Sequence, residues 1–256
     1  MADKNEKIEK NLKLTDENAN YDIKRNLAEC ELYDKSLKVI VLGDSSVGKS
    51  SLIDRIKHNR FQELSSTLSI EYHSYITSVN DYTLRMQLWD TAGQEKFNSI
   101  ISNYYKGTDV GIFLYAIDNE KSFQDVENWF KNLKENTSDK TLNILIGNKR
   151  DIDDEKEEGK RMVTFERAEK FAEDNHFYVF REISCKSKEQ YELDNILEIF
   201  DEIGKYFYEQ SKENKNTTTN PADINYQVSN SMMLLGRKHK IKESGGQIEE
   251  KKKKCC

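Results

Sequence analysis

Residues 43–50 form a short loop whose residue types suit the binding of phosphate groups. The apolar run Leu37–Leu42 before it predicts a buried strand, and an amphipathic helix is predicted to begin near Lys49. Between a strand and a helix N-terminus, backbone N–H groups can surround a phosphate. The loop reads Gly43, Asp44, Ser45, Ser46, Val47, Gly48, Lys49 and Ser50.

Each part of this loop suits a different part of a nucleoside triphosphate. Gly43 and Gly48 permit the tight turn, and the backbone N–H groups of residues 46–50 are expected to point at the β-phosphate. The ammonium of Lys49 would lie between the β- and γ-phosphates, and the hydroxyl of Ser50 would bind Mg²⁺. The predicted phosphate-binding residues are Gly43, Ser45, Ser46, Val47, Gly48, Lys49, Ser50 and Ser51.

A second motif, Trp89–Glu95, contains groups that could sense a γ-phosphate. Asp90 directly follows the predicted strand Leu84–Trp89, at the edge where ligands bind in parallel α/β sheets, and we expect it to hold Mg²⁺ through water. Gly93 would let its backbone N–H reach the γ-phosphate. Gln94 is the predicted catalytic residue, because its side chain could orient the attacking water.

A third motif, residues 148–151, indicates that the base is guanine. Guanine carries two adjacent hydrogen-bond donors, and the carboxylate of Asp151 can accept both. Adenine would leave this carboxylate unpaired, and a site built on such pairs rejects the analogue by on the order of 10⁴. The aliphatic part of Lys149 would cover one face of the base, and Asn148 belongs to the same site.

Two further segments contain candidate residues whose alternatives remain open. Ser184, Cys185 and Lys186 follow the predicted strand 178–183. The backbone N–H of Cys185 could donate to the guanine oxygen with Lys186 beside it, although the segment could also be an ordinary strand end. Phe61 could stack on the second face of the base, or it could pack inside the protein.

Thr67 is the candidate for a second hydroxyl on Mg²⁺, bound only when the γ-phosphate is present. Ser65, Ser66 and Ser69 lie close to it in the sequence and are rival hydroxyls. The sequence therefore predicts three metal-binding side chains, those of Ser50, Thr67 and Asp90.

The composition describes one domain of ordinary size with polar extensions. The chain has 256 residues, of which 36% are hydrophobic and 34% charged, and its net charge is −6. Residues 1–36 carry nine acids and seven bases, and residues 209–256 carry six acids and ten bases, so the middle segment carries −8. An acidic body argues against nucleic acid as a partner, and a basic tail favours an anionic surface.

The cysteines and the N-terminus indicate a cytosolic protein. Cys30, Cys185, Cys255 and Cys256 show neither metal-ligand spacing nor a disulfide framework. The N-terminus lacks the apolar core of a signal peptide, and no apolar run has the length of a membrane span. We therefore expect synthesis in the cytosol, with reduced thiols.

Apolar runs alternate with helical patterns through the middle of the chain. Further strands are predicted at Val110–Tyr115 and Leu142–Gly147, and apolar residues at helical spacing occur in 123–133 and 196–207. This alternation predicts βαβ units and therefore an α/β fold with a mostly parallel sheet.

We divide the chain into three segments. Residues 1–36 are predicted to be a mobile N-terminal extension, with a short helix near Tyr21–Tyr33 as an option. Residues 37–210 are predicted to form the ordered domain. Residues 211–256 are rich in Asn, Thr and Ser and are predicted to be a flexible tail.

On these motifs the chain resembles the Ras-like small GTPases over about residues 37–210, and within them the Rab branch. The residues that carry the resemblance are Trp89–Phe97, Ser99–Ile100, Tyr104–Gly107, Tyr115–Asp118, Ser122–Phe123 and Trp129. The resemblance implies a P-loop NTPase fold with a six-stranded sheet and five helices, GTP/GDP and Mg²⁺ binding, slow GTP hydrolysis and a role in vesicle-mediated transport. It also implies an exchange factor, a GTPase-activating protein, an escort protein or GDP-dissociation inhibitor, and effectors. We expect a monomer.

The chain departs from the pattern of this family in two places. Residues 67–72 read Thr-Leu-Ser-Ile-Glu-Tyr, where the family usually has Thr-Ile-Gly before an acidic-aromatic pair, and the loop 61–67 is about one residue shorter. These differences leave the effector specificity and the closed geometry of this loop open. Residues 151–161 are longer and more charged than the family's usual loop, and we interpret them as a solvated insertion.

The C-terminus suits a lipid anchor. Lys251–Lys254 precede Cys255 and Cys256, and no C-a-a-X box is present. A basic cluster beside an anionic leaflet assists an attached lipid, and stable attachment needs two signals. The resemblance implies geranylgeranyl groups on both cysteines, and hence a protein in the cytosol and on the cytoplasmic face of an intracellular membrane.

Two other functions fit parts of the sequence. A scaffold that holds GTP and scarcely hydrolyses it would fit the altered segment 67–72. An ATP-dependent kinase would fit the phosphate loop alone, but the motif 148–151 disfavours it because it selects guanine.

Overall fold

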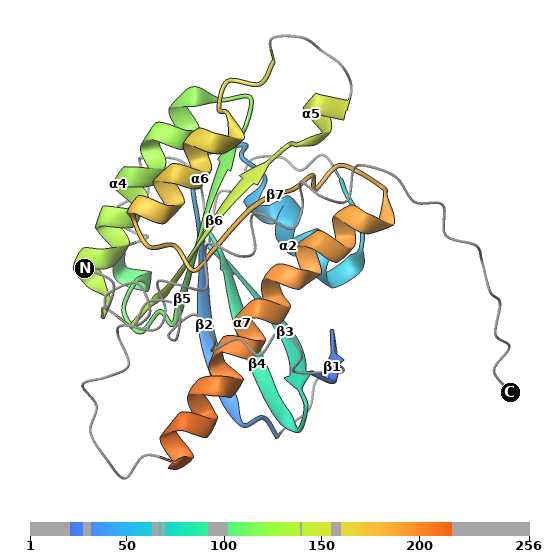
Figure 1. The fold of residues 1–256 in the computed structure, drawn as a ribbon, viewed down its shortest axis with the longest axis vertical. Helices are drawn as coiled ribbons and strands as arrows, with labels where there is room; N and C mark the ends of the chain where they lie inside the picture. Colours follow the sequence, from blue (N-terminus) through green and yellow to red (C-terminus); the bar gives the residue numbers. More distant parts are fainter. Residues whose placement is uncertain are drawn as a thin grey trace, which may run out of the picture.

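The computed structural model describes residues 21–27, 32–62, 67, 70–91, 102–138, 140–154 and 160–216. Within them it forms one sheet with helices on both sides (Figure 1). Gly93, Gln94, Cys255 and Cys256 lie outside the described residues, as do the rival hydroxyls Ser65, Ser66 and Ser69.

The described part of the chain contains a seven-stranded sheet in the order β1-β3-β4-β2-β5-β6-β7. The strands are β1 (Ile23–Lys24), β2 (Lys35–Leu42), β3 (Glu71–Val79), β4 (Tyr82–Asp90), β5 (Val110–Ala116), β6 (Leu142–Asn148) and β7 (Val179–Glu182). β2 is parallel to both β4 and β5, and β6 and β7 continue this parallel arrangement. β3 is antiparallel to both of its neighbours, β1 and β4. The predicted α/β fold is therefore confirmed.

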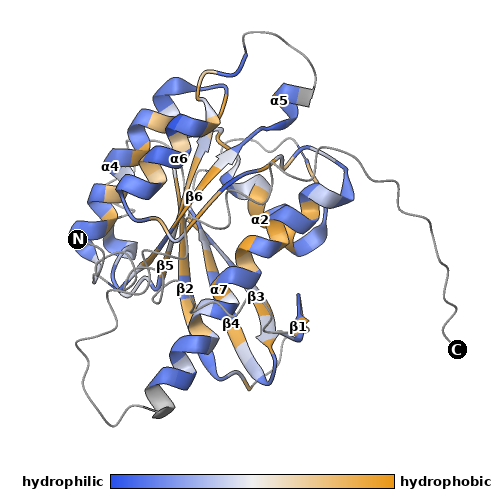
Figure 2. Cartoon of the chain, viewed as in Figure 1, coloured by the Kyte–Doolittle hydropathy of each residue, from blue (hydrophilic) through white to orange (hydrophobic). Residues whose placement is uncertain are grey.

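Helices cover both faces of the sheet. They are α2 (Lys49–His58), α4 (Glu120–Asn136), α5 (Asp151–Asp154), α6 (Phe165–Asp174) and α7 (Gln190–Asn216), with a 3₁₀ turn η2 at Ser102–Tyr104. α4 and α6 pack on one face, and α2 and α7 pack on the other (Figure 1). Their apolar sides face the sheet and their polar sides face outward (Figure 2).

The parallel strands bring the functional loops to one edge of the sheet. β2 ends at Leu42, β4 at Asp90 and β6 at Asn148. Because these strands run in the same direction, the loops that follow them meet at their carboxyl ends. All seven residues of β5, in the middle of the sheet, are buried, as expected for a strand covered on both faces.

The edge of the sheet differs from the prediction, because residues 21–27 are not a mobile extension. β1 pairs with the end of β3, with Ile23 opposite Val79. The backbone N–H of Leu27 then donates to the carbonyl of Ile76 at 2.9 Å. An edge strand presents unpaired backbone groups, and this segment satisfies them. The sheet thus gains a seventh strand beyond the six that were expected.

Side chains of the same segment attach it to α7. The guanidinium of Arg25 donates to Asp201, with Nε 3.0 Å from Oδ1 and Nη2 2.5 Å from Oδ2. The hydroxyl of Tyr21 donates to Glu209 at 3.2 Å. The side chain of Asp201 is only 5% exposed, so its charge depends on this partner. The ordered domain therefore begins before residue 37.

Replacing Asp201 with Asn is expected to lower the free energy of unfolding by about 1–2 kcal/mol, because a buried charge-assisted pair is lost. Urea denaturation of the full chain would measure this. Asp22→Asn is a matched control, since Asp22 is 70% exposed and pairs only loosely with Lys24 at 3.7 Å. Equal stability of wild type and Asp201→Asn would show that the Arg25 contact contributes nothing to folding.

Candidate nucleotide-binding site

The loop between β2 and α2 has a backbone that only glycine can adopt at two positions. Gly43 has φ +141°, and a Cβ there would lie 2.2 Å from the carbonyl oxygen of Leu114. Gly48 has φ +102°, and a Cβ there would lie 2.1 Å from Nδ2 of Asn148. Both glycines are therefore required by the turn, as the sequence predicted. Ser46 also has a positive φ, +63°, which is strained for a residue with a side chain.

Lys49 provides a buried positive charge at the start of α2. Its side chain is 6% exposed, and its ammonium donates to the carbonyl oxygens of Gly43 at 2.9 Å and Asp44 at 2.7 Å. Burial lowers the pKa of Lys49 to about 8, although Asp90 and Asp44 act in the opposite direction. A phosphate placed here would favour the charged ammonium, since it supplies the missing negative charge.

The three predicted metal-binding side chains meet at this loop. The Ser50 hydroxyl lies 2.8 Å from the hydroxyl of Thr67 and donates to Oδ2 of Asp90. Thr67, Ser50 and Asp90 come from three separate parts of the chain. The structure therefore brings together the residues that the sequence assigned to Mg²⁺.

The donor set at this point suits Mg²⁺, which prefers oxygen ligands and retains several waters. Asp90 is 2% exposed, and its Oδ1 is a buried oxygen without a hydrogen-bond partner among the described residues. Burial raises the pKa of Asp90, and the hydrogen bond from Ser50 and the charge of Lys49 partly offset this. A cation near Oδ1 would supply the interaction that this carboxylate lacks.

Asn148 joins the phosphate loop to the predicted base site. Its Nδ2 donates to the carbonyl oxygen of Val47 at 2.8 Å, and its Oδ1 accepts the backbone N–H of Cys185 at 3.1 Å. The sequence left open whether this N–H donates to the guanine oxygen or belongs to an ordinary strand end. In the structure it is already paired with Asn148, so it can serve guanine only by sharing or exchanging this bond.

The segment 184–186 approaches Asp151 through side chains. The Ser184 hydroxyl donates to Oδ1 of Asp151 at 2.5 Å, and the Lys186 ammonium lies 3.5 Å from Oδ2. These contacts fix the carboxylate that the sequence assigned to guanine. Cys185 is buried, which raises the pKa of its thiol to about 12, so this thiol does not act as a nucleophile.

Lys149 and Phe61 have the exposure that contact with a base requires. Lys149 has φ +73°, and its ammonium lies 3.2 Å from Asp118 while its side chain is 35% exposed. Phe61 is 37% exposed, so its ring does not belong to the core. Stacking of Phe61 on the base stays a prediction. Ser45 is exposed and Ser51 half-buried at the phosphate loop.

Sequence reasoning missed two pairs that support the site. The indole N–H of Trp129 on α4 donates to Oδ1 of Asp44 in the phosphate loop at 2.9 Å. Arg150, inside the guanine motif, pairs with the buried Glu192 of α7. The available signal for Glu192 was an acid near the start of a helical pattern, because the helix dipole favours acids in the first turn.

Comparisons with known proteins agree with this geometry. The model of the Ras family matches residues 38–209. Rab-13 of Bos taurus is 40% identical over 156 residues, which cover 60% of this chain and 74% of that protein. Rab-11B of Dictyostelium discoideum is 34% identical over 204 residues, which cover 79% of this chain and 86% of that protein. SEC4 of Saccharomyces cerevisiae is 34% identical over 184 residues, which cover 72% of this chain and 80% of that protein. The chain therefore belongs to the Ras family of small GTPases and, within it, to the Rab proteins.

Proposed function

We propose that this protein is a membrane-anchored switch in vesicle-mediated transport that binds GTP or GDP with Mg²⁺ and slowly hydrolyses GTP. The observation that carries this proposal is the meeting of Lys49, Ser50, Thr67 and Asp90 at one end of the sheet. Membership of the Rab proteins supports the same function.

The residues of the site divide the binding of the nucleotide between them. Lys49 and the backbone of the phosphate loop hold the phosphates, and Asp151 accepts the two donors of guanine. Ser50, Thr67 and Asp90 would hold Mg²⁺, which when bound neutralises charge on the β- and γ-phosphates. Thr67 would bind in this way only with GTP, so loss of the γ-phosphate releases its segment.

The partners follow from the surface and the tail. Tyr72, Trp89 and Tyr104 form a row of aromatic rings with centroids 5.6 and 5.4 Å apart, and Tyr72 is 44% exposed. Exposed aromatic rings suit a docking surface for effectors. An exchange factor, a GTPase-activating protein and a GDP-dissociation inhibitor complete the proposed cycle of a monomeric switch.

Geranylgeranyl groups on Cys255 and Cys256 are the proposed anchor, assisted by Lys251–Lys254. Across the part of the chain that the structure describes, no helix combines the length and the apolar character needed to cross a membrane. The proposed location is the cytosol and the cytoplasmic face of an intracellular membrane.

Replacing Gln94 with Leu is expected to slow single-turnover hydrolysis of GTP by at least about 10-fold, because the attacking water loses its orienting amide. The affinity for GTP should stay unchanged. Gln124→Leu is the matched control, since Gln124 lies on α4, where its side-chain amide donates to Glu120 at 2.9 Å. If wild type hydrolyses GTP no faster than the Gln94→Leu variant, even with activators, the protein is instead a scaffold that holds GTP.

A further inference from the structure

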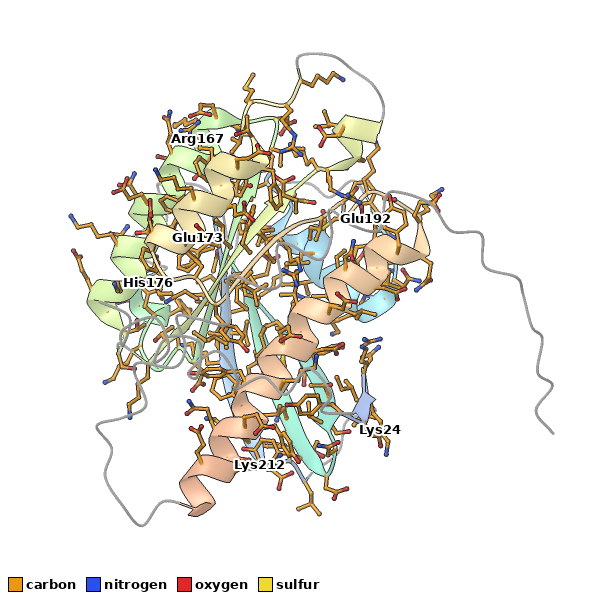
Figure 3. The ribbon with its side chains drawn as sticks, viewed as in Figure 1. Lys24, Arg167, Glu173, His176, Glu192 and Lys212 are labelled. Atoms are coloured by element: carbon orange, nitrogen blue, oxygen red, sulfur yellow. The ribbon has the colours of Figure 1, made fainter. Side chains whose placement is uncertain are left out.

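Glu192 is a buried carboxylate that contacts both loops of the predicted base site. It lies in the first turn of α7 (Figure 3), and its side chain is 0% exposed. Its Oε2 accepts the backbone N–H of Ser184 at 3.1 Å. Its Oε1 accepts both Nε of Arg150, at 3.0 Å, and Nη2 of the same side chain. One oxygen is therefore used for each loop.

The two groups that Glu192 holds are neighbours of the base-binding residues. Arg150 stands between Lys149 and Asp151, and Ser184 donates its hydroxyl to Asp151. The two loops come from β6 and β7, so they approach each other only through the fold. Movement of either loop would change the position of the Asp151 carboxylate relative to guanine.

A carboxylate at position 192 would be energetically unfavourable if this side chain only filled space. A buried charge is unfavourable unless it is paired, and an apolar side chain of similar size would fill the same volume without that cost. The two oxygens of Glu192 instead satisfy one donor from each loop, and the N-terminus of α7 favours the negative charge. The residue thus fixes the distance between the loops as well as the start of α7.

We propose that Glu192 is a positioning residue for guanine recognition, which holds Asp151 where it can accept both donors of the base. This inference rests on the proposed guanine site. It predicts that loss of the carboxylate lowers the selectivity for guanine, beyond any loss of stability. Inosine diphosphate is the appropriate probe, because hypoxanthine lacks the exocyclic amine from which Asp151 is proposed to accept a hydrogen bond.

The experiment measures the dissociation constants of GDP and IDP for the full chain and for three variants. In Glu192→Ala the preference for GDP over IDP is expected to fall by ~10-fold, because the second hydrogen bond to Asp151 becomes misaligned. Glu192→Gln keeps one acceptor oxygen and is expected to recover part of the preference. Asp201→Asn is the matched control, since Asp201 is also a buried acid on α7 but pairs with Arg25 away from both loops.

The outcomes separate this inference from the proposed function. A reduced preference in Glu192→Ala, with wild-type preference in Asp201→Asn, supports the positioning role. Equal weakening of GDP and IDP in Glu192→Ala would overturn it, since a purely structural role predicts that result. If wild type itself does not prefer GDP to IDP, the guanine site fails and the inference fails with it. If Glu192→Ala does not fold, the Glu192→Gln comparison decides: an unchanged preference would overturn the inference, and a reduced one would support it.

Discussion

Replacing Asp151 with Asn is expected to reduce the affinity for GDP by up to about 10⁴-fold. The reason is that the carboxylate accepts two hydrogen bonds from guanine, and an amide cannot accept both. The carboxylate is fixed by the Ser184 hydroxyl at 2.5 Å and by Lys186 at 3.5 Å. An Asn amide would present a donor to the donors of guanine. Xanthine has an oxygen where guanine has its amine, so the variant should gain affinity for xanthine nucleotides.

Competition of GDP and XDP for the same purified protein would measure this change. Asp153→Asn is a matched control, because Asp153 lies on the same short helix α5 but is 41% exposed and pairs with Arg161. The control should keep the wild-type preference. If Asp151→Asn also keeps it, Asp151 does not read the base and the argument for guanine loses its main residue.

Replacing Lys49 with Met is expected to weaken binding of GDP and GTP by about 10²–10³-fold, because a desolvated charge pair with phosphate costs 2–5 kcal/mol when one member is removed. Met retains most of the unbranched part of the side chain, so the change acts mainly through the ammonium. The losses for GDP and XDP should be equal, since the base does not contact Lys49. This separates the effect from that of Asp151→Asn.

Lys57→Met, in the last turn of the same helix α2, is the control for the loss of a positive charge. It is expected to leave nucleotide binding unchanged. Equilibrium dialysis with labelled GDP would measure both variants. Wild-type affinity for GDP in Lys49→Met would contradict the proposed role of the buried ammonium in phosphate binding.

Much of the sheet was predictable because its strands carry their own signal. β5 and β6 are apolar runs and β4 alternates apolar and polar residues, so the pattern of apolar residues alone indicates these strands. β3 was not identified individually, since Glu71–Val79 begins with polar residues and only its second half is buried. The available signal was the two-residue turn at Asn80–Asp81, where Asn80 has φ +53°.

β1 could not be predicted from its own residues. Its two residues carry no strand pattern, and they are ordered because the edge of β3 offers unpaired backbone groups. The partner of Arg25 is Asp201, which lies 176 residues further along the chain. Contacts of this kind depend on the completed fold and are not visible in the local sequence. The polar composition of residues 1–36 therefore predicted a mobile segment.

The candidate site also has parts that the sequence predicted and parts that it did not. The phosphate loop and Asp90 were predictable because a motif fixes both residue type and position relative to a strand. The pairing of the Cys185 N–H with Asn148 was not, because it depends on how closely two loops approach. The role of Glu192 was also missed, since its partner Arg150 lies 42 residues away in the sequence.

Identification of the nucleotide that copurifies with the full chain would test the central claim most directly. The protein is denatured, and the released nucleotide is identified by ion-exchange chromatography. The geometry of Asp151, Lys49 and Ser50 predicts GDP, the product of a guanine nucleotide switch that hydrolyses GTP. An adenine nucleotide, or no nucleotide at all, would contradict the claim.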